Sequence, residues 1–240
     1  MPFLRYCVLG FLLFSCLAFG AEPEKGPTPI ASLQPLQGLI GSWRASGVPE
    51  GSTEEKQKGH WTETIDWSWK FKDKDCWLEV MFNKGKYFTR GEIRPGKEAS
   101  TFQFKLDTTS KETWLFQGTL KDKQLIFERT DEQTKDLYKL VIALLHDNRI
   151  TYRMEVKGEG KTFAKRLYQV GATKEGEAFA SIGVSERECV VSGGTGTSTV
   201  TFNGKTYYVC CSGCRDEFKA NPEKYVTEFE KKRAASEKKK

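Results

Sequence analysis

The stretch that decides the fold is residues 61–71, WTETIDWSWKF, in which large apolar side chains alternate with polar ones. The apolar side chains stand at odd positions: Trp61, Ile65, Trp67, Trp69 and Phe71. Threonine, aspartate, serine and lysine fill the even positions between them. Because successive side chains of a strand point to opposite faces, this period of two gives one apolar and one polar face. Residues 61–71 are therefore predicted to form a half-buried β-strand.

The same alternation recurs in short segments up to about residue 170. Turn signals such as Asn83–Gly85, Pro95–Gly96 and Asp147–Asn148 separate these segments, and helical patterns are nearly absent. Short strands at regular spacing are typical of an antiparallel barrel, which closes on itself and leaves no exposed edge. We therefore predict a mainly β protein in which residues 36–170 form an up-and-down barrel of about ten strands.

The start of this region carries a short motif, Gly41-Ser-Trp43. It resembles the Gly-x-Trp signature of the lipocalin and calycin barrels, in which the tryptophan packs across the closed end. The resemblance implies a lipocalin-like barrel with an internal cavity for a small, mostly apolar ligand. The alternative is a barrel that its own Trp and Phe side chains fill. Both alternatives stay open at this point.

The N-terminus has the features of a secretory signal peptide over residues 1–20. Arg5 supplies a positive charge, residues 6–17 form an apolar run, and Ala18-Phe-Gly20 fits a cleavage site. The run is short for a membrane span, and no later segment reaches that length. We therefore expect an exported protein, periplasmic or secreted, with no transmembrane segment. Lipoprotein anchoring at Cys16 is an alternative that the bulky Phe14 disfavours.

The composition of the segments outside the barrel indicates how the rest of the chain is organised. Residues 21–35, rich in Pro, Glu and Gly, are predicted to form a flexible lead-in, and residues 171–187 a linker. The formal net charge of +6 is mild, and a basic tail at residues 231–240 contributes to it. No aromatic or recognition pattern interleaves these charges, so no nucleic-acid partner is expected. Residues 188–230 are left as a small second unit.

Four of the seven cysteines lie in this second unit: Cys189, Cys210, Cys211 and Cys214. Asn203-Gly204 stands between two runs of β-forming residues, which predicts a hairpin with a type I′ turn. The hairpin delivers Cys210 at the end of its second strand, a helix starts shortly afterwards, and Asn221-Pro222 begins another. Thiolates gathered at a turn and a helix N-terminus form a site for a soft or borderline ion such as Zn²⁺ or Cu⁺.

The same segment resembles the YHS domain and its relative the TRASH domain, small metal-binding modules of heavy-metal sensors and of copper and zinc handling proteins. The resemblance covers about residues 187–227. It rests on Cys189, on the Tyr-Tyr-x-Cys-x-x-x-Cys pattern of residues 207–214, on Phe218 and on the Asn-Pro-x-x-Tyr pattern of residues 221–225. It implies that Cys189, Cys210 and Cys214 bind the metal ion.

One departure from that family pattern concerns the fourth ligand. Cys211 stands where a serine is common, so it either completes a shell of four thiolates or is a bystander. The segment contains no histidine, which leaves water or a partner protein as the other choices.

Two further interpretations of the cysteines stay open. In an oxidising compartment Cys189 and Cys214 can form a structural disulfide. Cys211-Ser-Gly-Cys214 is formally the Cys-x-x-Cys of a thiol-disulfide oxidoreductase, although the βαβ context of thioredoxin is absent. We expect an exported, non-enzymatic protein that senses, stores or transfers Zn or Cu. The alternative is a barrel that binds an apolar ligand, with the cysteine unit as a disulfide- or metal-stapled domain that contacts a partner protein.

Overall fold

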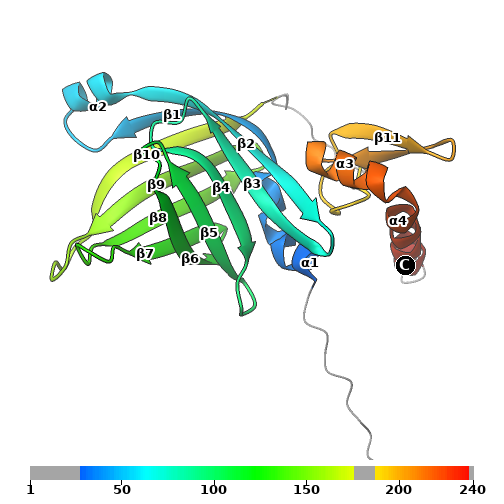
Figure 1. Ribbon diagram of the computed structural model, residues 1–240. Helices are drawn as coiled ribbons and strands as arrows, with labels where there is room; N and C mark the ends of the chain where they lie inside the picture. The colour runs from blue at the N-terminus through cyan, green and yellow to red at the C-terminus, as the bar shows by residue number, and fades with distance from the viewer. Residues whose placement is uncertain (1–27, 176–186, 238–240) are drawn as a thin grey trace, which may run out of the picture.

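The computed structural model describes residues 28–175 and 187–237 of the chain. The predicted signal peptide with Cys16, the first part of the lead-in and most of the predicted linker lie outside these residues. Figure 1 shows a β-barrel with a smaller unit of one hairpin and two helices beside it. Among the described residues, no helix is both long and apolar enough to cross a membrane.

Ten antiparallel strands form a closed barrel, which confirms the prediction of a mainly β fold. Each strand pairs with the next along the chain, and the tenth closes the barrel by pairing with the first. A short helix, α2 (Thr53–Gly59), joins the first two strands. The strands are β1 (Gly41–Pro49), β2 (Trp61–Lys72), β3 (Asp75–Asn83), β4 (Phe88–Pro95), β5 (Thr101–Thr108), β6 (Thr113–Lys121), β7 (Gln124–Thr130), β8 (Leu137–His146), β9 (Arg149–Lys157) and β10 (Lys165–Lys174).

Strand β2 follows the predicted alternation, because its buried residues stand at odd positions from 63 to 69. Their side chains and those of the other strands fill the barrel. The largest that are less than 2% exposed include Trp43, Trp69, Phe102, Phe104, Phe116 and Phe127. An apolar cavity of about 20 Å³ remains beside Trp67 and Tyr152. This volume is close to that of one water-sized probe, so the barrel is filled by its own side chains.

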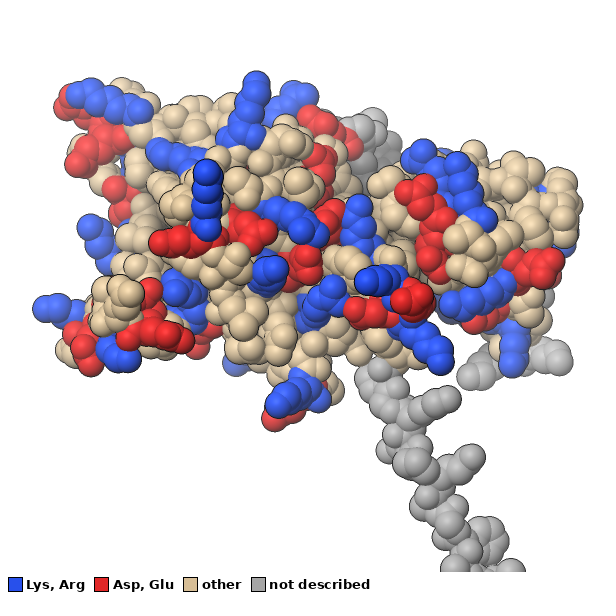
Figure 2. Space-filling model, viewed as in Figure 1, with Lys and Arg blue, Asp and Glu red and all other residues tan. Residues whose placement is uncertain are grey.

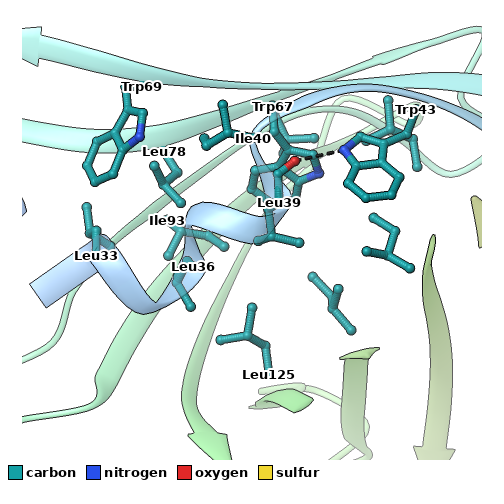
Figure 3. Packing of buried hydrophobic residues seen from close by; sticks show 14 of the residues in the cluster. Leu33, Leu36, Leu39, Ile40, Trp43, Trp67, Trp69, Leu78, Ile93 and Leu125 are labelled. Carbon is teal, nitrogen blue, oxygen red and sulfur yellow. Dashed lines mark hydrogen bonds between the residues drawn. The ribbon is translucent and has the colours of Figure 1, made fainter. Parts of the chain in front are cut away.

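One end of the barrel is covered by α1 (Pro29–Leu33) and the 3₁₀-helix η1 (Gln34–Leu39) (Figures 1 and 3). Their leucines, Leu33, Leu36 and Leu39, are fully buried. Residues 29–35, expected to belong to a flexible lead-in, are therefore helical and packed, because the three leucines close the core. Trp43 lies at this closed end and donates its indole N–H to the Leu39 carbonyl over 2.8 Å.

The outer surface of the barrel carries charges of both signs, which are interspersed on the face shown in Figure 2. Ion pairs cross from strand to strand: Glu79 contacts Lys70 at 3.1 Å and Arg90 at 2.7 Å. Arg90 continues the row to Glu92 at 2.7 Å. These side chains cover the polar faces of β2, β3 and β4 that the alternation predicts.

The C-terminal module, residues 187–237, contains β11 (Ser198–Phe202), β12 (Lys205–Val209), α3 (Ser212–Ala220) and α4 (Pro222–Glu237). Asn203 and Gly204 have φ angles of 48° and 75°, as the predicted type I′ turn requires. Helix α4 continues through residue 237, so much of the predicted basic tail is helical. Tyr207, Phe218 and Tyr225 form a small core.

Candidate metal centre

The first part of the centre is a tight loop, residues 189–194, which we call the first ligand loop. The Cys189 N–H donates to the Gly194 carbonyl over 2.6 Å, and the Gly193 N–H donates back to the Cys189 carbonyl over 2.8 Å. The Val190 N–H donates to the Tyr208 carbonyl over 2.9 Å, which fastens the loop to β12. The loop therefore holds the Cys189 side chain beside the end of the hairpin.

The second part is residues 210–214, the second ligand loop, which joins β12 to α3. Cys210 follows the last residue of β12, Cys211 is the N-cap of α3, and Cys214 lies in the first turn of that helix. The Arg215 N–H donates to the Cys211 carbonyl over 3.1 Å, as the first helical turn requires. The free N–H groups and the dipole of a helix start favour thiolates at this place.

Three of the four predicted ligands meet in one cluster. The sulfur atoms of Cys189, Cys210 and Cys214 all lie within 4.8 Å of one another, and those of Cys210 and Cys214 are 3.6 Å apart. All three side chains are buried. A Zn–S distance of about 2.3 Å places neighbouring sulfurs of a tetrahedral shell about 3.8 Å apart. The thiol cluster of Cys189, Cys210 and Cys214 therefore fits a thiophilic metal ion.

The fourth predicted ligand, Cys211, lies beside the thiol cluster rather than within this set of three. Its side chain is half-buried. Hydrogen bonds from the thiols of Cys210 and Cys214, and from the backbone N–H groups of Cys214 and Trp69, lower the pKa of Cys211. The lowered pKa favours the thiolate form of Cys211, and its role as a ligand stays a prediction.

Hydrogen bonds among the thiols also shift the pKa values of the three cluster cysteines in opposite directions. Those from Cys210 and Cys214 lower the pKa of Cys189. The same contacts with Cys189 raise the pKa values of Cys210 and Cys214. A metal ion must displace the protons that remain on these two thiols, because thiolate is the form that binds metal.

Ser192 belongs to the centre, although the sequence analysis does not identify it. Its side chain is 3% exposed. Its hydroxyl shares a hydrogen bond of 3.3 Å with the Cys210 sulfur, and its backbone N–H lies 3.5 Å from the Cys189 sulfur. Ser192 therefore orients two of the three cluster sulfurs. Its position in the first ligand loop, three residues after Cys189, is the only sequence signal of this role.

A cavity of about 420 Å³ opens beside the first ligand loop. Its lining includes Ile30 of α1, Gln34 of η1, Cys189 and Ser192 of the first ligand loop, and Phe229 of α4. Lys232 and Glu188, also in its lining, form an ion pair of 2.6 Å. The cavity brings solvent or a ligand close to the thiol cluster on the Cys189 side.

Comparison with known families agrees with this geometry. The model of the YHS domain matches residues 195–228. The C-terminal module therefore contains a YHS domain, as the cysteine and aromatic pattern predicts, and it follows a closed ten-strand barrel. The matched segment includes Cys210, Cys211 and Cys214 and begins after Cys189. No curated protein matches the chain.

Proposed function

We propose that this protein binds one Zn²⁺ or Cu⁺ ion through Cys189, Cys210 and Cys214. The observation that carries the proposal is the convergence of three buried sulfurs, within 4.8 Å of one another, from two separate loops. Thiolates are the preferred ligands of these ions, and three of them at this spacing surround a common centre. The match to the YHS domain supports the same assignment.

Metal binding explains the sulfur positions better than a disulfide does. The five described cysteines are free, and the Cys210 and Cys214 sulfurs are 3.6 Å apart. A disulfide requires about 2.05 Å between its sulfurs. A metal ion at the centre of the cluster needs no comparable movement. We propose binding rather than thiol-disulfide catalysis at Cys211 and Cys214, because the module is a hairpin with two helices and lacks the βαβ context of thioredoxin.

The number of ligands bears on what the site does with its ion. Three thiolates can satisfy Cu⁺, whereas Zn²⁺ takes a fourth ligand. Cys211, water from the cavity beside Cys189 or a group of a partner protein can supply it. An exchangeable fourth ligand suits a protein that senses or transfers metal. We place this activity outside the cytoplasm on the strength of the signal-peptide features of residues 1–20.

The barrel has a different part in this proposal. Its interior leaves about 20 Å³, far less than the several hundred Å³ of a typical small-molecule site. We propose that the barrel is a scaffold for the module and not the place where an apolar ligand binds. Incubating the protein with an apolar fluorescent probe tests this point, since binding inside the barrel would raise the emission of the probe.

A cobalt titration tests the metal site itself. Co²⁺ substitutes for Zn²⁺, and thiolate ligands give it intense charge-transfer bands. We expect these bands at one Co²⁺ per wild-type chain and their loss in Cys189→Ser and Cys214→Ser. Cys76→Ala is the matched control, because Cys76 is buried in β3 outside the cluster. Bands that persist in both cluster variants would contradict the proposal, and a changed band intensity in Cys211→Ser would identify Cys211 as the fourth ligand.

A further inference from the structure

The second ligand loop touches the barrel at a point with no room for a side chain. A Cβ atom on Gly213 would lie 1.7 Å from the backbone carbonyl oxygen of Trp69. Trp69 is part of β2 and is fully buried, so its backbone is fixed by the barrel core. Cys210 and Cys214 are carried by the loop that contains Gly213. Glycine is therefore required here, because any larger residue would push these cysteines away from β2.

The first ligand loop also touches the barrel end, there against a side chain rather than backbone. A Cβ atom on Gly194 would lie 2.0 Å from the side-chain amide carbon of Gln37. Gln37 belongs to η1, the helix that closes the barrel end, and it is flanked by the buried Leu36 and Leu39. Gly194 in turn accepts the hydrogen bond from the Cys189 N–H that closes the loop.

The two barrel residues are connected to each other. The indole N–H of Trp69 donates to the Gln37 side-chain oxygen over 2.9 Å. The Trp69 carbonyl oxygen in turn lies against Gly213 of the second ligand loop. The pair Gln37–Trp69 therefore contacts both ligand loops, and neither residue supplies a metal ligand.

We infer that Gln37 and Trp69 are positioning residues of the metal centre, so that the barrel fixes the distance between the two ligand loops. This inference rests on the proposed function. A rigid support beneath both loops lowers the conformational entropy that the module loses when the ion binds. By linkage, a bound ion stabilises the docking of the module on the barrel by the same free energy.

Zn²⁺ affinity of the full chain, measured by competition with a chromophoric chelator, tests the inference. Gln37→Ala removes the support of the first loop and the hydrogen bond to Trp69, and Gly213→Ala forces the second loop away from β2. We expect each variant to bind Zn²⁺ about 10-fold to 100-fold more weakly, the usual effect of losing an outer-shell contact. Gln117→Ala is the matched control, because Gln117 is an exposed residue of β6 outside both ligand loops, and it should bind like wild type.

A spectroscopic readout separates positioning from a general loss of structure. The Co²⁺ charge-transfer bands of Gln37→Ala should keep the wild-type shape at saturation, since the ligands are unchanged. Hydrogen exchange gives the reciprocal effect: Zn²⁺ should slow amide exchange in β2 and η1 of the wild type and leave β6 and β7 unaffected.

Three results would count against the inference. Wild-type affinity in Gln37→Ala would overturn it, and this variant keeps the test valid if Gly213→Ala fails to fold. Unchanged exchange in β2 and η1 on Zn²⁺ addition would overturn it as well. A wild-type chain that binds no metal would overturn the proposed function together with the inference, which distinguishes the two failures.

Discussion

Glu63 shows how a single charged residue is accommodated inside the barrel. It is 4% exposed and accepts hydrogen bonds from the Tyr152 hydroxyl, from the Trp61 indole at 3.2 Å and from the Lys86 backbone N–H at 3.4 Å. Three donors satisfy the carboxylate without a cation, as buried polar groups require. Its odd position in residues 61–71 places it inward, but the alternation could not identify Lys86, in the turn between β3 and β4, or Tyr152, on β9, as its partners.

Replacing Tyr152 by phenylalanine should destabilise the barrel at neutral pH. The change leaves the buried Glu63 carboxylate with one donor fewer, and we expect a loss of about 1–3 kcal/mol in the free energy of unfolding. Urea denaturation measures this value. Tyr138→Phe is the control, because the Tyr138 hydroxyl forms no hydrogen bond within the described part of the chain. Equal stabilities of the two variants would show that the Glu63 contact contributes nothing.

The same tyrosine makes stability depend on alkaline pH. Burial raises the pKa values of Tyr152 and Tyr168 well above their usual range, because it disfavours the phenolate. A folded-state pKa above the unfolded value gives stability that is complete below about pH 10 and is lost as pH rises through the folded pKa. The free energy of unfolding should therefore decrease above pH 10, and less steeply in Tyr168→Phe. A stability that is constant up to pH 11 would contradict this assignment.

At the scale of elements, local chemistry explains which parts of the fold are readable from the sequence. Alternation over whole strands predicts the barrel, and Asn203-Gly204 predicts the hairpin because only positive φ angles fit its turn. Helices α1 and η1 escape prediction because each is too short to show a full apolar period. Such helices are stabilised by burial rather than by their own sequence, and burial depends on the completed barrel.

The closing helix η1 should be a major source of barrel stability. Leu36→Ala removes a fully buried side chain from the covered end, and we expect the free energy of unfolding to fall by about 2–5 kcal/mol. Thermal and urea unfolding, followed by tryptophan fluorescence, measure the loss. Leu115→Ala is the control, since Leu115 is 56% exposed, and its effect should stay within about 0.5 kcal/mol. A Leu36→Ala protein as stable as this control would mean that η1 does not close the core.

In the molecule as a whole, a large filled barrel carries a small module whose own core consists of a few aromatic side chains. The cysteine spacing predicts the thiol cluster, because a hairpin must bring Cys189 back to the start of α3. The docking of this module on the barrel could not be predicted, since it depends on contacts between Gly213 and Trp69, residues far apart in the chain. A glycine in each ligand loop is the only feature of the sequence that reflects this docking.

Removing the metal should therefore affect the two units differently. A chelator takes away the ion that we propose joins the two ligand loops, and the aromatic core of the small module is too small to replace it. We expect faster proteolysis within residues 188–227 after chelation, while the barrel keeps its circular dichroism and its tryptophan fluorescence. Equal cleavage of the module with and without chelator would show that no ion stabilises it.

The metal content of the protein tests the central claim most directly. The protein is purified anaerobically, its Zn and Cu are measured by elemental analysis, and free thiols are counted on the same sample. We predict one ion per chain in the wild type, its loss in Cys189→Ser and Cys214→Ser, and cluster thiols that become titratable only after chelation. A metal-free protein whose cluster cysteines are oxidised would contradict the claim and would identify a disulfide-stapled module instead.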